Sequence, residues 1–105
     1  MKRGEIRWYN FKAPDKKRPI LILTRSSVMD YLGEITIAPI TSTVRDIPSE
    51  VFLCRDDGLK KDCAINFDHI QTVSKTKIGS LITKLSPDKL RSVNEAISFA
   101  LGLED

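Results

Sequence analysis

Residues 16–24, Lys16-Lys17-Arg18-Pro19-Ile20-Leu21-Ile22-Leu23-Thr24, set three cations directly against an unbroken apolar run. The run is short, β-branched and leucine-rich. It predicts a strand that is buried on both faces, because a helix would need about ten or more residues. Proline restricts the backbone of the residue before it, so we expect Arg18 to be extended at the entrance of this strand.

A guanidinium held at the rim of a rigid core strand is well placed to bind phosphate, since its planar fork offers paired donors. The alternative is a solvated basic turn before a core strand, because most clusters of charge are only surface. Residues 16–18 by themselves leave both interpretations open.

The chain has 105 residues, which predicts a single domain over residues 1–105. Its hydrophobic content of 41% and charged content of 30% are ordinary for a soluble globular protein. No apolar run approaches the roughly 18 residues of a membrane span, and the first residues lack the apolar stretch of a signal peptide. We therefore expect a cytoplasmic protein with no membrane partner.

Positive charge is concentrated at the start of the chain. The formal net charge is +3. Residues 1–25 hold eight cations and two anions and so carry +6, which leaves −3 for the remainder. A polyanion-binding surface requires a one-sided field of this kind.

The side chains that mark many catalytic or metal sites are scarce. Cys54, Cys63 and a single histidine make a poor zinc set, because no close pair of cysteines is present. In a cytoplasmic chain we expect two reduced, largely buried thiols. The sequence has no phosphate-binding glycine loop, nucleophile elbow or Cys-His-Asn set recognisable by spacing. We expect no cofactor and no metal.

Alternating and short apolar runs predict several strands, and the last stretch predicts a helix. Ser86 suits an N-cap, Pro87 the first helical position, and apolar residues then recur at helical spacing until Gly102. A mainly β fold with a C-terminal helix follows, built as a small, strongly bent antiparallel sheet or barrel. The strands are expected at residues 5–11, 19–24, 34–41, 50–54, 62–67, 70–73 and 81–85.

Three polar stations stand at the ends of these strands: residues 16–18, the hydroxyl-rich stretch Thr41-Ser42-Thr43, and Asp68-His69-Ile70-Gln71-Thr72. Taken singly, a Thr-Ser-Thr stretch is usually a turn, and a lone histidine is usually structural or merely exposed. Composition does not show that the three stations meet.

Taken in order, these stations resemble the MazF/PemK family of toxin endoribonucleases, the mRNA interferases. The resemblance covers essentially the whole chain. The motifs that carry it are Lys2-Arg3-Gly4-Glu5-Ile6, Lys17-Arg18-Pro19, Ala38-Pro39-Ile40-Thr41-Ser42-Thr43, Gly58-Leu59-Lys60-Lys61-Asp62, Asp68 to Val73, and the closing helix from Leu85-Ser86 to Leu103.

The resemblance implies a compact SH3-like barrel, a homodimer and metal-independent cleavage of single-stranded RNA, whether mRNA, tRNA or rRNA. It also implies a cognate antitoxin with an acidic, flexible tail that occludes the RNA groove. The family's catalytic arginine falls on Arg18 and its catalytic threonine on Thr41. The positions implied to bind substrate are Lys16, Lys17, Ser42, Thr43, Asp68, His69 and Gln71.

Two stretches depart from the family's pattern. The loop over residues 12–17 is several residues shorter than usual and lacks its customary glycines. His69 and Gln71 stand where relatives commonly have a glutamine and then an arginine. Because both stretches lie where relatives contact RNA, we expect the cut sequence to differ from that of better-known members.

RNA carries its own nucleophile, the 2′-hydroxyl. Arg18 is suited to stabilising the crowded phosphorane, and Thr41 could orient the 2′-hydroxyl or the phosphate. Neither is a plausible general base near neutral pH. His69 is the only side chain whose ordinary pKa, about 6.5, lies in the working range. If it faces the groove it could act as acid or base, or stack on a base.

Three rival functions share this fold: a non-enzymatic gyrase poison, an RNA-binding barrel that does not cut, and a degenerate partner that only heterodimerises. Fold alone excludes none of them. Arg18 together with Thr41-Ser42-Thr43 argues for the nuclease.

Overall fold

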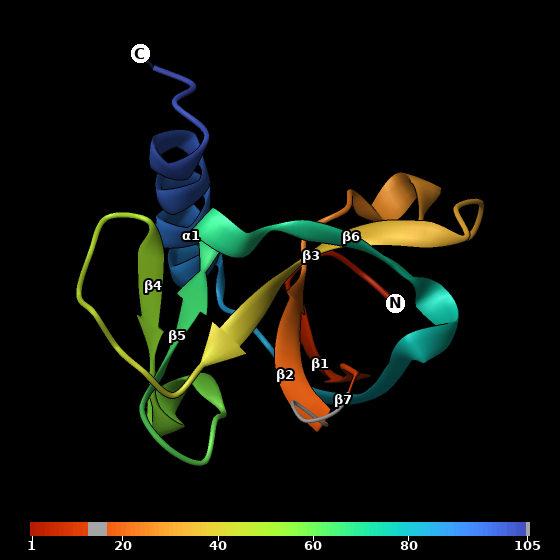
Figure 1. The fold of residues 1–105 in the computed structure, drawn as a ribbon, viewed down its shortest axis with the longest axis horizontal. Coiled ribbons are helices and arrows are strands. Elements are labelled where there is room, and N and C mark those ends of the chain that lie inside the picture. Colours follow the sequence, from red (N-terminus) through yellow and green to blue (C-terminus); the bar gives the residue numbers. More distant parts are fainter. Residues whose placement is uncertain (13–16, 105) are drawn as a thin grey trace.

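The computed structural model describes residues 1–12 and 17–104. The described connections between its strands include four 3₁₀ turns, and one helix follows the last strand (Figure 1). The elements in chain order are β1 (Glu5–Asn10), β2 (Lys17–Ile22), β3 (Glu34–Thr41), β4 (Glu50–Leu53), β5 (Cys63–Asn66), β6 (Gln71–Ser74), β7 (Ile78–Lys84) and α1 (Pro87–Ala100).

All the strand pairings are antiparallel, and the strands follow the order β4-β5-β3-β2-β1-β7. β3 is long enough to pair with β6 along its first half and with β5 at its end. The predicted mainly β class with a C-terminal helix is therefore confirmed. Among the described strands no pairing joins β4 to β7, so the bent sheet does not close into a complete barrel.

No helix within residues 1–12 and 17–104 is both long enough and apolar enough to cross a membrane.

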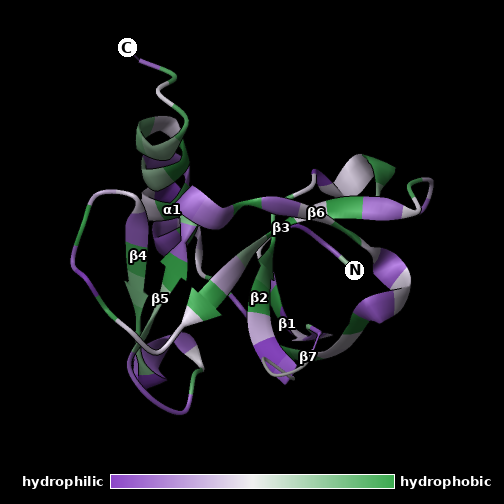
Figure 2. Cartoon of the chain, viewed as in Figure 1, coloured by the Kyte–Doolittle hydropathy of each residue, from purple (hydrophilic) through white to green (hydrophobic). Residues whose placement is uncertain are grey.

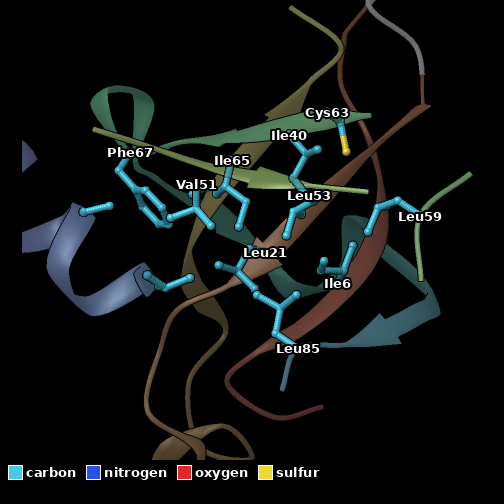
Figure 3. Close-up of a cluster of buried hydrophobic side chains, with 13 residues drawn as sticks. Ile6, Leu21, Ile40, Val51, Leu53, Leu59, Cys63, Ile65, Phe67 and Leu85 are labelled. Atoms are coloured by element: carbon cyan, nitrogen blue, oxygen red, sulfur yellow. The ribbon is translucent and has the colours of Figure 1, made fainter. Parts of the chain in front are cut away.

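β2 is buried on both faces, as its unbroken apolar run predicts. Ile20, Leu21 and Ile22 are each completely buried. Leu21 belongs to a cluster that includes Val93 and Ala96 of α1, here called the α1 cluster (Figure 3). Ile20 and Ile22 belong to a second cluster on the other face, here called the Met29 cluster, whose buried members are Tyr9, Ile20, Ile22, Met29, Ile35, Ile37 and Val73. One strand thus separates two cores.

The boundaries of two predicted strands are corrected. β2 begins at Lys17 and not at Pro19, because Lys17 and Arg18 pair with Asn10 and Tyr9 of β1. Figure 2 shows the consequence, a strand that is hydrophilic at its first residues and hydrophobic beyond them. The turn predicted before it falls mostly on residues 13–16, which lie outside the described residues.

β7 begins at Ile78, three residues before the predicted start at residue 81, because Ile78 pairs with Tyr9. The register between β1 and β7 shifts twice along the ladder. The prediction of residues 81–85 covered only the second part of this strand, because the first part is set by pairing with β1, which is far away in sequence.

The predicted start of α1 is confirmed. Ser86 Oγ accepts a 3.1 Å hydrogen bond from the Lys89 backbone N–H, and Pro87 occupies the first turn. Val93 and Ala96 pack the helix onto the sheet. Past its end, Gly102 takes a positive φ of 66°, a conformation that glycine adopts at little cost.

Cys54 and Cys63 are both free thiols. Cys63 is buried, and burial, followed by the charges of Asp57 and Asp62, raises its pKa above the usual value. Cys54 is only half-buried, so the expectation of two largely buried thiols holds for one of them.

Candidate functional site

The register of β2 against β3 brings two of the predicted site residues to one level. Ile20 lies opposite Pro39, and the next two pairs keep the same register. Extending that register by two residues places Arg18 level with Thr41. Residues opposite one another in an antiparallel pair project to the same face. We infer that Arg18 and Thr41 share the face that carries the Met29 cluster.

The sheet divides at this level. Beyond Pro39, β3 leaves β2 and pairs Ile40 and Thr41 with β5. Arg18 is exposed, and Thr41 is half-buried. The two residues therefore lie at the level where the β2–β3 pairing ends.

Tyr9 extends this row on the other side of Arg18. It is the direct partner of Arg18 in the β1–β2 ladder and is buried in the Met29 cluster. Its ring contacts that of Phe11 edge-on, with the ring centroids 4.6 Å apart. Tyr9 and Phe11 thus place two aromatic rings on the face of β1 that corresponds to the face of Arg18 on β2. The alternation of β1 already put Tyr9 and Phe11 on one face, but only the ladder showed that Arg18 joins them.

Lys17 lies on the opposite face from Arg18. Its ammonium nitrogen stands 5.6 Å from the centroid of the Trp8 ring, a cation–π contact. Since neighbouring residues of a strand project to opposite faces, the predicted basic station is split by β2. Lys16, the third member of that station, lies outside the described residues.

The hydroxyl-rich corner is a compact turn. Thr41 Oγ1 accepts a 3.1 Å hydrogen bond from the backbone N–H of Thr43. Because this bond uses a lone pair of the oxygen, the hydroxyl proton is directed away from the turn and can be donated to an anion. Ser42 and Thr43 are exposed beside it.

The third station is held by two buried polar side chains that sequence analysis did not single out. Ser49 Oγ donates a 2.7 Å hydrogen bond to Asp68 Oδ2, and Asn66 Oδ1 accepts a 3.0 Å bond from the Asp68 backbone N–H. Ser49 and Asn66 are nearly inaccessible, whereas Asp68 and His69 are exposed. In the sequence, the only sign of this role was the position of Ser49 directly before Glu50 and the strand that begins there.

The third station reaches the same face as Thr41, at a distance. Gln71 is paired with Ile37 of β3 and donates a 3.4 Å hydrogen bond from Nε2 to the His69 carbonyl. Ile37 precedes Thr41 by four residues, which is about 13 Å along a strand. The extended register therefore puts Arg18 level with Thr41, and Gln71 lies further along one side of β3.

The loop between β3 and β4 is anchored by a carboxylate that sequence analysis also missed. Glu50 accepts a 3.0 Å hydrogen bond from the Arg45 backbone N–H and lies 3.5 Å from its guanidinium. The Glu50 side chain is only 2% exposed. An acidic residue inside an apolar strand, five residues after an arginine, was the available signal. This anchor fixes the loop that follows Thr41.

Within the part of the chain that the structure describes, no group of three or more His, Cys, Asp or Glu side chains lies close enough to hold a metal ion. Two surface depressions, of about 530 and 420 Å³, lie along α1, and neither is lined by Arg18 or Thr41. The candidate site is an open face of the sheet and not an enclosed pocket.

Comparison with known proteins assigns the family. The model of the PemK-like, MazF-like toxins of type II toxin–antitoxin systems matches residues 2–101. A Mycobacterium tuberculosis protein named probable endoribonuclease MazF2 is 35% identical over 103 residues, which cover 97% of this chain and 99% of the relative.

Solved structures give the same result. The Mycobacterium tuberculosis toxin MazF-mt6 superposes with a TM-score of 0.86 at 35% identity, covering 93% of this chain and 96% of the toxin. An endoribonuclease in complex with its cognate antitoxin, from a mycobacterial species, superposes with a TM-score of 0.87 at 25% identity. The match covers 98% of this chain and 96% of that endoribonuclease chain. The chain belongs to the PemK-like, MazF-like family of toxins of type II toxin–antitoxin systems.

Proposed function

We propose that this protein is the toxin of a type II toxin–antitoxin system and acts as a sequence-specific endoribonuclease on single-stranded RNA, without a metal. The relative named endoribonuclease at 35% identity, which aligns over nearly the full length of both chains, supports the activity. The observation that supports the chemistry is the β2–β3 register, which, when extended by two residues, puts Arg18 level with Thr41 on one face.

The proposed reaction is an internal transfer of the phosphate. The 2′-oxygen attacks the adjacent phosphorus and forms a P–O bond while the bond from phosphorus to the 5′-oxygen breaks. The 2′-hydroxyl loses its proton to a base, and the departing 5′-oxygen gains one. The products are a 2′,3′-cyclic phosphate and a 5′-hydroxyl, so no water and no cofactor enters this step.

Arg18 and Thr41 have separate roles in this proposal. Arg18 donates paired hydrogen bonds to the nonbridging oxygens, where negative charge grows in the phosphorane. Thr41 donates its hydroxyl proton to the phosphate, since the backbone N–H of Thr43 already occupies a lone pair of its oxygen. Both residues then bind the transition state more strongly than the ground state, as catalysis requires.

The third station contributes RNA contacts in this proposal. Asp68, His69 and Gln71 are exposed, and Gln71 shares its side of β3 with Thr41. Nucleotides next to the scissile phosphate would run along β3 past these side chains, together with Ser42 and Thr43.

Two protein partners and a location complete the proposal. One solved relative is described as bound to its cognate antitoxin, and we propose that this chain binds an antitoxin with an acidic tail and forms a homodimer in the cytoplasm. Three apolar side chains at the end of α1 are more than half exposed and offer surface for a protein partner: Phe99, Leu101 and Leu103.

The test is incubation of the purified protein with labelled single-stranded RNA in the presence of EDTA, followed by analysis of the ends. We expect cleavage at a defined sequence and 2′,3′-cyclic phosphate ends. Sequencing the 5′ ends of transcripts after brief expression gives the cut site. Bound but intact RNA would make the protein an RNA-binding barrel, and intact RNA with inhibited gyrase would make it a gyrase poison.

A further inference from the structure

Phe52 lies in the middle of β4, and 46% of it is exposed. Its neighbours Val51 and Leu53 are buried in the α1 cluster (Figure 3). Because side chains alternate along a strand, the Phe52 ring lies on the face of the sheet that turns away from α1. On the helix side its backbone carbonyl accepts a 3.1 Å hydrogen bond from Lys89 Nζ, and Phe52 borders the depression of about 420 Å³ along α1.

Two strand pairings connect Phe52 with Thr41. Phe52 lies opposite Ala64 in the β4–β5 ladder, and Ala64 lies opposite Thr41 in the β5–β3 ladder. Directly opposed residues project to the same face, so the three form one row. Two strand spacings, about 10 Å, separate its ends. The middle residue, Ala64, is completely buried, so within this row only the ring of Phe52 and the side chain of Thr41 reach the surface.

Cations flank this row. Arg45, whose side chain is half exposed, is bound to Glu50, which precedes Phe52 by two residues and so shares its face. At the other end of the row, Arg18 is level with Thr41. Exposed aromatic rings among cations are the arrangement with which proteins hold single-stranded nucleic acid, since cations track the backbone and rings stack on bases.

We propose that Phe52 is the stacking platform for one nucleobase of the RNA, in a nucleotide that flanks the phosphate held by Arg18 and Thr41. This inference rests on the proposed ribonuclease function and deepens it by adding a base-binding subsite on β4. Every base has a π face, so the subsite contributes affinity and positions the strand, with little choice among the bases.

The surroundings of Phe52 favour RNA over a protein partner. A stable protein interface buries about 800 Å² on each side around a contiguous apolar core. The neighbours of Phe52 in its own row and on its own strand are Ala64 and the charged Glu50. The depression along α1 that Phe52 borders is also lined by the charged side chains of Lys89 and Glu95. The end of α1, with Phe99 and two exposed leucines, has the apolar character that a protein partner needs.

The test compares Phe52→Leu with Phe52→Trp, because leucine keeps the apolar bulk and tryptophan keeps a π face. Tyr31→Leu, at an aromatic residue that is exposed in the loop between β2 and β3, is the matched control. The substrate is a short single-stranded RNA that contains the cut site mapped from transcripts. We expect Phe52→Leu to raise KM roughly 5- to 100-fold, Phe52→Trp to restore it, and Tyr31→Leu to leave it unchanged.

RNAs that lack one base at a single position beside the cut locate the stacked nucleotide. At that position, loss of the base should raise the KM of the wild-type protein. The KM of Phe52→Leu should be the same for the intact RNA and for the RNA that lacks this base. A wild-type KM in Phe52→Leu, or a loss that tryptophan does not repair, would overturn the stacking role. So would unchanged cleavage with weakened dimer or antitoxin binding, which would assign the ring to a protein interface. A wild-type protein that neither cuts nor binds RNA would instead overturn the proposed function itself.

Discussion

Ser49 Oγ donates a 2.7 Å hydrogen bond to Asp68 Oδ2, and this bond ties the residue before β4 to the corner that carries His69. A second tie runs from the Phe67 backbone N–H to the Ser49 carbonyl, 3.0 Å long. Ser49 is almost completely buried. Ser49 therefore holds the turn Phe67–His69 from a position nineteen residues before Asp68. The His69 side chain is exposed on this turn.

His69→Gln tests whether this corner moves protons. If His69 acts as acid or base, the pH profile of kcat should lose one limb near neutral pH in the variant, because glutamine does not titrate there. Asp68→Asn, which keeps an acceptor for Ser49, is the control and should retain the limb. A profile of unchanged shape in His69→Gln would assign the histidine to RNA contact or packing.

Arg18→Ala should lower kcat for RNA cleavage by about 10²- to 10³-fold, the usual loss when one donor to a developing oxyanion is removed. Lys17→Ala is the matched control, because Lys17 lies over Trp8 on the opposite face of β2. It should lose far less activity. Circular dichroism would verify that both variants stay folded. Equal losses in the two variants would mean that only the charge of this end of β2 matters.

Thr41→Val keeps the shape of the side chain and removes its hydroxyl. We expect kcat to fall about 10- to 100-fold, while stability falls by about 1 kcal/mol because the bond from the Thr43 backbone N–H is lost. Thr41→Ser keeps the hydroxyl and should retain most of the activity. Single-turnover cleavage and thermal unfolding separate the two effects, and a fully active valine variant would remove Thr41 from the chemistry.

Gly58→Ala should destabilise the fold by about 1–3 kcal/mol, since Gly58 has a φ of 97°. An added Cβ would also clash with the side chain of Thr83. Gly33→Ala is the control, because an added Cβ there meets nothing within 4 Å. Urea unfolding of both variants measures the difference. Equal midpoints would show that the turn after β4 relaxes to admit alanine.

Glu5→Gln tests an electrostatic contact in β1. Burial raises the pKa of Glu5, but hydrogen bonds from Arg7, whose Nε lies 2.7 Å away, and from the Lys2 backbone outweigh burial and hold the pKa below its usual value. A lowered folded-state pKa stabilises the protein above the unfolded-state pKa, and this contribution is lost as the pH falls through the folded value.

We therefore expect Glu5→Gln to be less stable than the wild type by about 0.5–1 kcal/mol at neutral pH. The difference should vanish at about pH 2, where the wild-type carboxyl is protonated. Glu104→Gln, at an exposed position, should match the wild type throughout. Thermal unfolding as a function of pH measures this, and a gap that persists in acid would refute the ionic origin.

Local patterns in the sequence predicted the elements well where packing follows periodicity. The apolar run from Ile20 predicted a strand buried on both faces, and Ser86-Pro87 predicted the start of α1. The predicted strand boundaries were wrong where pairing with a strand distant in sequence sets them. Lys17 and Arg18 join β2, and Ile78 begins β7, because all three pair with β1.

The sequence by itself determined the residue types of the site and the order of the three stations, since turn chemistry and alternation are local properties. Only the tertiary structure decided which stations meet. A strand's two-residue period sends Lys17 and Arg18 to opposite faces, and the β2–β3 register brings Arg18 level with Thr41. The turn Phe67–His69 adds residues between β5 and β6, so β3 pairs with both strands and carries Gln71 further along its edge. Register is fixed by the simultaneous burial of two clusters, which is a non-local condition.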